Sequence, residues 1–253
     1  KELHSLEQLK VLKLYLPEVK LLDESFLKEM TRLSSTQFRF IVGRHLRRIM
    51  SRLPREVEVK FERWNRCLKY VNGEDIPTEV IELLQHTTAF FLDRHSSVTT
   101  LSEFGIDSLK NLKLFILAEC NKTQTIVDGG KFFKESHDNR DKDEEKVLES
   151  LDYLSVHYMK SLMSIWIGPI RKCCLCNLKS LTLQTCPQLT IIFTLDLLGN
   201  LNVLEELVID DCPAIESLVS QESPSEHKLL ASASIYFLPK LKKLSLHYLP
   251  KLV

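Results

Sequence analysis

Glycine is scarce in this chain, with seven in 253 residues, and none of the seven belongs to a phosphate-binding pattern. The sequence has no G-x-x-x-x-G-K-[ST] or G-x-G-x-x-G loop, no H-E-x-x-H pair and no G-x-S-x-G elbow, although it has eight histidines. No apolar run approaches the roughly 20 residues that a membrane-spanning helix needs. We therefore expect neither an enzyme nor a membrane span, and no cofactor in this segment.

Net charge is also absent, because 34 Lys and Arg balance 34 Asp and Glu. With 44% hydrophobic and 27% charged residues, the composition is typical of a soluble protein. The chain begins at Lys1 and has no signal peptide. We interpret it as a segment of a longer protein.

Cysteine occurs seven times, so at least one thiol stays unpaired in any disulfide scheme. The cluster Cys173, Cys174 and Cys176 raises a zinc hypothesis, but a second ligand pair at zinc-finger spacing is missing. We expect free thiols in a reducing compartment and no metal site.

A frame of the form L-x-x-L-x-x-L-x-L-x-x-C recurs along the chain, and it is typical of leucine-rich repeats. Its last position falls at Cys120, Met159, Cys186, Cys212 and Leu249, so the ordinary interval is 26 to 27 residues. In L-x-L both leucines point inward and the middle residue points outward, because strand side chains alternate. The sequence predicts an α/β solenoid, a horseshoe with a parallel sheet on its concave face and irregular or short helical segments on its convex face.

Two longer intervals place insertions near residues 134–146 and 220–234, and we expect both to be surface loops. A fainter copy of the frame uses Ala89 and Phe91 as the inward pair and Arg94 as the last position. Leu12 with Leu14, and Phe38 with Phe40, indicate strands near the N-terminus. We interpret residues 1–253 as one solenoid, with irregular repeats over 1–82, regular repeats over 83–253, and no repeat boundaries assigned within 44–82.

Residues in equivalent positions of stacked repeats form columns across the sheet. One column has alternating charges, which we expect to neutralise one another: Lys113, Asp152, Lys179, Glu205 and Lys242. Two further columns pass through the strand ends and contain aromatic residues, which supply contact area at low entropic cost. From them we predict partner contacts at His157, Tyr158, Asp210, Asp211, His247 and Tyr248.

A second candidate surface is basic, since ten Lys or Arg face three acids between residues 39 and 72. It lacks the aromatic interleaving or recognisable module of a nucleic-acid site, so an acidic protein surface is the favoured partner. The closely spaced members are Arg44, Arg47, Arg48, Arg52 and Arg55.

Residues 86–129 and 177–219 resemble the repeats of plant disease-resistance proteins, notably in their C-P-x-L/I and I-E-S-L-V phrases. More narrowly, they resemble the coiled-coil, nucleotide-binding, leucine-rich-repeat class of immune receptors. This resemblance implies a cytoplasmic sensor, which other domains of the receptor can bring to the plasma membrane. Its partners would be a pathogen effector or a guarded host protein, and its own nucleotide-binding domain, which it would restrain. ADP or ATP would bind only to that other domain.

Two other classes also use leucine-rich repeats. A plant cell-surface receptor has repeats of about 24 residues with an L-x-G-x-I-P phrase, cap cysteines and many glycosylation sequons, whereas this chain has one sequon, at Asn121–Thr123. A substrate receptor of a ubiquitin ligase remains the alternative, although no F-box-like helical segment precedes the repeats.

Overall fold

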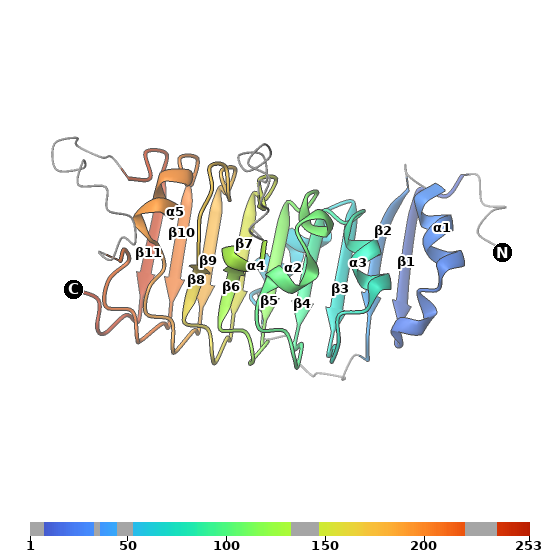
Figure 1. Ribbon diagram of the computed structural model, residues 1–253, viewed down its shortest axis with the longest axis horizontal. Coiled ribbons are helices and arrows are strands. Elements are labelled where there is room, and N and C mark those ends of the chain that lie inside the picture. The colour runs from blue at the N-terminus through green and yellow to red at the C-terminus, as the bar shows by residue number, and fades with distance from the viewer. Residues whose placement is uncertain (1–7, 33–35, 45–52, 133–146, 221–236) are drawn as a thin grey trace.

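Nine parallel strands form one sheet in a computed structural model that describes residues 8–32, 36–44, 53–132, 147–220 and 237–253. The strands lie side by side in the order of the chain, which confirms the predicted leucine-rich-repeat α/β solenoid (Figure 1). Their bounds are β1 (Val11–Leu16), β2 (Gln37–Val42), β3 (Arg66–Val71), β4 (Ala89–Asp93), β5 (Leu114–Ala118), β7 (Tyr153–His157), β9 (Ser180–Gln184), β10 (Glu206–Asp210) and β11 (Lys243–His247).

The inward pair of each regular repeat stacks on the pair of the next repeat. Leu207 pairs in register with Leu181, and Ile209 with Leu183, and all four are buried. The stacked pairs from β1 to β10 form one hydrophobic core with the convex segments, whereas Leu244 of the last strand, β11, is exposed. Each repeat therefore buries its apolar edge against its neighbours, as stacked repeats must.

The cysteine at the end of the frame turns into the solenoid in three repeats. Cys120, Cys186 and Cys212 are buried, and each Sγ donates to the carbonyl two residues earlier, at 3.4, 3.6 and 3.5 Å. All seven cysteines are free thiols. A small, weak donor thus pairs with a backbone carbonyl at the end of each of these strands.

The frame predicted for the faint repeat before Cys120 was wrong by one residue. Register pairs Phe90 with Phe115 and Leu92 with Leu117, so Phe90 and Leu92 are the inward pair, and His95 occupies the thiol position. Every residue of β4 is buried, because its outward side chains are also covered. Alternation cannot be read from a strand that is apolar on both faces.

Both N-terminal strands were predicted at the correct place in the chain, but the inward pair of β1 was assigned two residues too early. Leu14 pairs with Phe40, which in turn pairs with Leu68, so the pair equivalent to Leu207 and Ile209 is Leu14 and Leu16 rather than Leu12 and Leu14. The unassigned stretch 44–82 contains β3 and two helices, α2 (Arg55–Glu62) and the start of α3 (Thr78–Leu84).

A left-handed residue follows seven of the strands, at Asn72, Arg94, Glu119, Tyr158, Thr185, Asp211 and Tyr248, with φ between 50° and 57°. This conformation is unfavourable for a residue with a Cβ atom. Backbone bonds to the next repeat stabilise it: the Tyr158 N–H donates to Gln184 O at 2.9 Å, and the Thr185 N–H donates to Asp210 O at 2.9 Å. Stacking thus holds this turn where the residue is not glycine, whereas after β2 the position is occupied by Gly43, with φ 99°. The turn aligns these side chains along one edge of the sheet.

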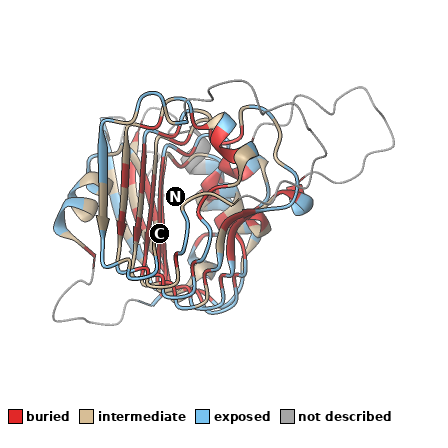
Figure 2. Cartoon of the chain, turned by 90° about the vertical axis from the view of Figure 1, so that its left-hand side faces the viewer, coloured by how far each residue is buried: buried red, intermediate tan, exposed pale blue. Residues whose placement is uncertain are grey.

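Short segments cover the inner side of the sheet and form the convex layer. They are η2 (Val19–Leu21), α1 (Glu24–Arg32), α3, η3 (Leu101–Phe104), η4 (Asp107–Leu109), α4 (Gly129–Phe132), α5 (Leu195–Asn200), and a second parallel sheet of β6 (Thr125–Asp128) and β8 (Ser164–Ile167). Viewed from the C-terminal end, the main sheet forms one wall and this layer the other (Figure 2). The predicted insertions fall almost entirely outside the described residues, at 133–146 and 221–236.

Candidate binding surface

The concave face consists of the outward side chains of the main sheet, which the register arranges in three columns. Sequence reasoning found the column at the strand ends, Asp93, Ala118, His157, Gln184, Asp210 and His247, apart from its first member. It missed the two central columns. These are Lys13, Arg39, Cys67, Ala89, Leu114, Tyr153, Ser180, Glu206 and Lys243, and Tyr15, Ile41, Lys69, Phe91, Ile116, Ser155, Thr182, Val208 and Ser245.

Helix α2 lies on this concave face instead of in the convex layer (Figure 2). Its apolar side forms a separate hydrophobic cluster with the sheet. From the helix segment come Leu53, Val57, Phe61 and Trp64, and from the strands come Cys67, Ala89, Phe91, Leu114, Ile116, Ala118 and Tyr153. The helix residues are spaced by four, four and three, which is a helical stripe that the sequence could have revealed.

Specific contacts fix α2 in place. Phe61 packs edge-on against Phe91 with ring centroids 5.9 Å apart, and Lys60 Nζ lies 4.3 Å from the centre of the Tyr153 ring. The Cys67 thiol lies within hydrogen-bonding distance of the Phe61 and Trp64 carbonyls, at 3.2 and 3.1 Å. Burial beneath the helix raises the pKa of Cys67 to about 12.

The helix divides the concave face into two open parts. On its N-terminal side a cavity of about 490 Å³ lies over β1, β2 and β3, and on its other side a hollow of about 260 Å³ lies over β7 to β11. The lining of the second hollow includes the polar side chains of Ser155, Thr182, Gln184 and Asp210. Ligands reaching the sheet must therefore approach on either side of α2.

His157 was predicted to contact a partner, and the structure corrects this. Its side chain is 0% exposed, and both ring nitrogens are used: Nε2 lies 2.7 Å from Ser155 Oγ and Nδ1 3.0 Å from Gln184 Oε1. Since an amide oxygen only accepts, Nδ1 carries the proton and Nε2 accepts from the Ser155 hydroxyl. Burial lowers the pKa of His157 to about 4, so the ring is neutral at physiological pH.

The remaining predicted residues gather at the C-terminal end of the sheet. Asp210 pairs in register with His247, and the left-handed residues Asp211 and Tyr248 follow them directly. Tyr248 is 81% exposed, while His247 and Asp211 are also exposed and Asp210 is half-buried. Tyr158 is half-buried and directly follows β7, two strands away from β10. Their role in partner contact stays a prediction.

The column of alternating charges is neutralised as expected. Lys179 Nζ lies 2.8 Å from Asp152, and Lys242 Nζ lies 3.1 Å from Glu205. The adjacent column behaves similarly, since Lys243 Nζ lies 2.6 Å from Glu206 and holds the pKa of that carboxyl below its usual range. Charges on β7 to β11 are thus largely paired within the sheet.

The basic surface can be placed only in part. Arg44 is exposed just after β2, with its guanidinium 3.9 Å from Glu18, and Arg55 is exposed at the first turn of α2. Arg47, Arg48 and Arg52 lie outside the described residues. The described ranges contain no group of three His, Cys, Asp or Glu side chains that could hold a metal ion.

Comparison with known proteins identifies the repeats. Residues 95–195 and 167–253 each match the family described as plant disease resistance protein RPS2-like, leucine-rich repeats, and together they span more than half of the chain. No curated protein and no solved structure matches it. Within the described residues, no helix is both long enough and apolar enough to cross a membrane. The chain belongs to the leucine-rich-repeat family of RPS2-like plant disease resistance proteins.

Proposed function

We propose that this chain is the recognition arm of a cytoplasmic immune receptor. It binds a pathogen effector, or a host protein altered by one, and it restrains the nucleotide-binding domain of its own receptor. It acts by binding and not by catalysis, and nucleotide binds only to the other domain. Family membership supports the general role, and the open part of the concave face supports the mode of recognition.

The observation that carries this proposal is the C-terminal end of the sheet. Beyond the reach of α2, Asp211, His247 and Tyr248 project from the ends of two adjacent strands, and all three are exposed. An exposed tyrosine next to ionisable groups provides apolar area and directional hydrogen bonds together, which is the composition of interface hot spots. Strand-borne positions are also held rigidly, so little ordering entropy is lost on binding.

Recognition is tested in the full-length receptor with Asp211→Ala and Tyr248→Ala combined. We expect the dose of the inducing pathogen needed for half-maximal cell death to rise about tenfold or more, since truncating one anchor costs over about 1.4 kcal/mol. The readout is a dose series at equal receptor abundance. Thr190→Ala, an exposed change on the convex side, should leave the response unchanged. An unaltered dose response in the double variant would contradict recognition at this end of the sheet.

Restraint of the nucleotide-binding domain is assigned to the other end of the solenoid. Arg44 and Arg55 are both exposed near the N-terminal repeats, and an acidic surface on the nucleotide-binding domain would complement them. Attraction between exposed charges weakens as salt is added. The contact should therefore depend on ionic strength.

A pulldown of this chain with its separately expressed nucleotide-binding domain tests the contact. We expect binding at low salt that falls as salt rises, and loss of binding when Arg44, Arg47, Arg48, Arg52 and Arg55 are all changed to Glu. The matched control reverses five exposed lysines elsewhere: Lys122, Lys160, Lys172, Lys240 and Lys251. Equal loss in both variants would mean that only net charge matters, and persistent binding in the arginine variant would refute the assignment.

A further inference from the structure

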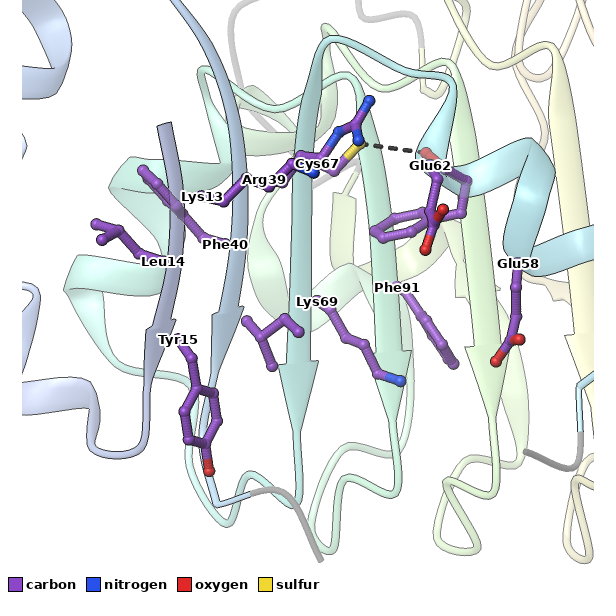
Figure 3. Close-up of a pocket in the computed structure, with 12 residues that line it drawn as sticks. Lys13, Leu14, Tyr15, Arg39, Phe40, Glu58, Glu62, Cys67, Lys69 and Phe91 are labelled. Carbon is purple, nitrogen blue, oxygen red and sulfur yellow. Dashed lines mark hydrogen bonds between the residues drawn. The ribbon is translucent and has the colours of Figure 1, made fainter. Parts of the chain in front are cut away.

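The cavity on the N-terminal side of α2 lies outside the residues that match the family and away from the C-terminal end of the sheet (Figure 3). Strands β1, β2 and β3 form its floor, and α2 forms its wall. Its volume of about 490 Å³ lies within the range of small-molecule sites, which are mostly apolar with a few polar groups. The size and boundaries are those of a pocket for a small organic ligand.

Two cations lie beside each other on the floor of this pocket, and the acids of the pocket lie on the opposite wall, α2. Lys13 and Arg39 occupy directly opposed positions on β1 and β2, where like charges repel. Among the described residues, neither side chain has an ion-pair partner. Lys69 in the same pocket differs, because its Nζ lies 3.3 Å from Asp93. Two adjacent cations without an ion pair of their own favour an anionic group as the ligand's polar part.

The rest of the floor is apolar. Phe91 and Phe61 meet edge to face at the base of α2, Ile41 projects from β2, and the Tyr15 ring is 51% exposed at the rim. Lys69 Nζ lies 4.2 Å from the centre of the Phe91 ring, which is buried, so the lysine and α2 together cover this ring. Such a floor suits a flat apolar or aromatic body, which packs on Ile41 and stacks on the exposed ring of Tyr15.

Two acids on α2 limit which anion can enter. Glu58 is half-buried and Glu62 is exposed, and both line the pocket opposite Lys13. Among the described residues, no ion pair joins Arg39 to Glu62. Both act on the pKa of Cys67, which Arg39 lowers and Glu62 raises. A ligand with a single negative group directed at β1 and β2 avoids the acids, whereas a multiply charged anion would be repelled by them.

We propose that this pocket binds a small aromatic monoanion, with its carboxylate or equivalent oxyanion between Lys13 and Arg39 and its ring on Ile41 and Tyr15. Arginine and lysine recognise such groups through charge-assisted hydrogen bonds. The site is independent of recognition at the C-terminal end of the sheet.

The probe is 2-naphthoate, titrated into the 253-residue chain by calorimetry. We expect a dissociation constant of about 0.1 to 1 mM, as is usual for a fragment of this size. Neutral naphthalene-2-methanol should bind about tenfold more weakly, and acetate should give no heat, because each lacks one half of the recognised chemistry. Equal binding of the neutral and anionic naphthalenes would overturn the proposal.

Variants separate the pocket from general surface charge. Lys13→Gln with Arg39→Gln should weaken 2-naphthoate about tenfold, while Lys122→Gln with Lys251→Gln, both exposed elsewhere, should not. Ile41→Trp fills the cavity while keeping both cations and should also abolish binding. Glu62→Gln removes a competing charge and should tighten binding about twofold. Undiminished binding in the Lys13 and Arg39 variant, or in Ile41→Trp, would place the probe elsewhere and refute the site.

Discussion

Lowering the pH from 7.5 to 5 is expected to reduce the free energy of unfolding by about 2 kcal/mol through His157 alone. Burial lowers the pKa of this histidine to about 4 in the folded protein, against an ordinary value of 6.5. The unfolded chain therefore binds the proton first as the pH falls. The stabilising contribution is complete above pH 6.5 and is lost between about pH 6.5 and pH 4. Urea titrations at a series of pH values measure it.

Comparison of variants isolates the histidine from the carboxylates that also titrate. His157→Gln should remove about 2 kcal/mol of the difference between pH 7.5 and pH 5, whatever its effect at neutral pH. The part of the pH dependence of stability that comes from His95 should remain, since burial also lowers the pKa of that histidine. His247→Gln, an exposed change in the same column, should leave the dependence intact. Parallel pH curves for His157→Gln and the parent chain would show that the folded state accepts the proton freely.

The same residue shows where sequence reasoning was sufficient and where it failed. The frame placed His157 in the correct column beside Gln184 and Asp210, because a repeat spacing fixes the register. It could not show that the column is partly buried. Whether a histidine at a strand end faces a partner or a neighbouring serine depends on contacts across repeats, which spacing does not encode.

The N-terminal third was predicted less well for a related reason. The signal for an inward pair depends on polar residues between apolar ones, and β4 has none before Asp93 because α2 covers its outward side. The sequence of β4 therefore showed apolar residues on both faces of the strand, but it did not show which segment packs on the outward face. The helix that packs there could be recognised from its apolar stripe between Leu53 and Trp64, but it lies outside the repeat frame.

Because α2 covers the middle of the concave face, it determines which strands a partner can reach. The apolar residues beneath it, among them Cys67, Phe91 and Ile116, would be an exposed patch if the helix were removed. Their burial stabilises the helix on the sheet, since an isolated helix of this length is marginal in water. Docking of α2 should thus depend on a few apolar side chains.

Phe61→Asp is expected to release α2 and to speed the alkylation of Cys67 by iodoacetamide at pH 8 by about 10² to 10³. In the intact protein Cys67 is 1% exposed and its pKa is about 12, so almost no thiolate is present. Once the helix leaves, the pKa returns toward its ordinary value and the thiolate fraction rises. Peptide mapping by mass spectrometry gives the rate at each cysteine. Buried Cys186 and Cys212 should stay protected, which separates helix release from unfolding of the solenoid.

The matched control is Val59→Asp, which places the same charge on the exposed side of the same helix, where the side chain is 38% exposed. It should leave Cys67 as slow as in the parent chain, because no apolar contact with the sheet is lost. If Phe61→Asp also leaves Cys67 protected while the solenoid stays folded, the helix does not control access to the strands beneath it. If Cys67 reacts as expected, the centre of the concave face is a surface that α2 occupies in the resting state, and a partner can use it only after displacing the helix.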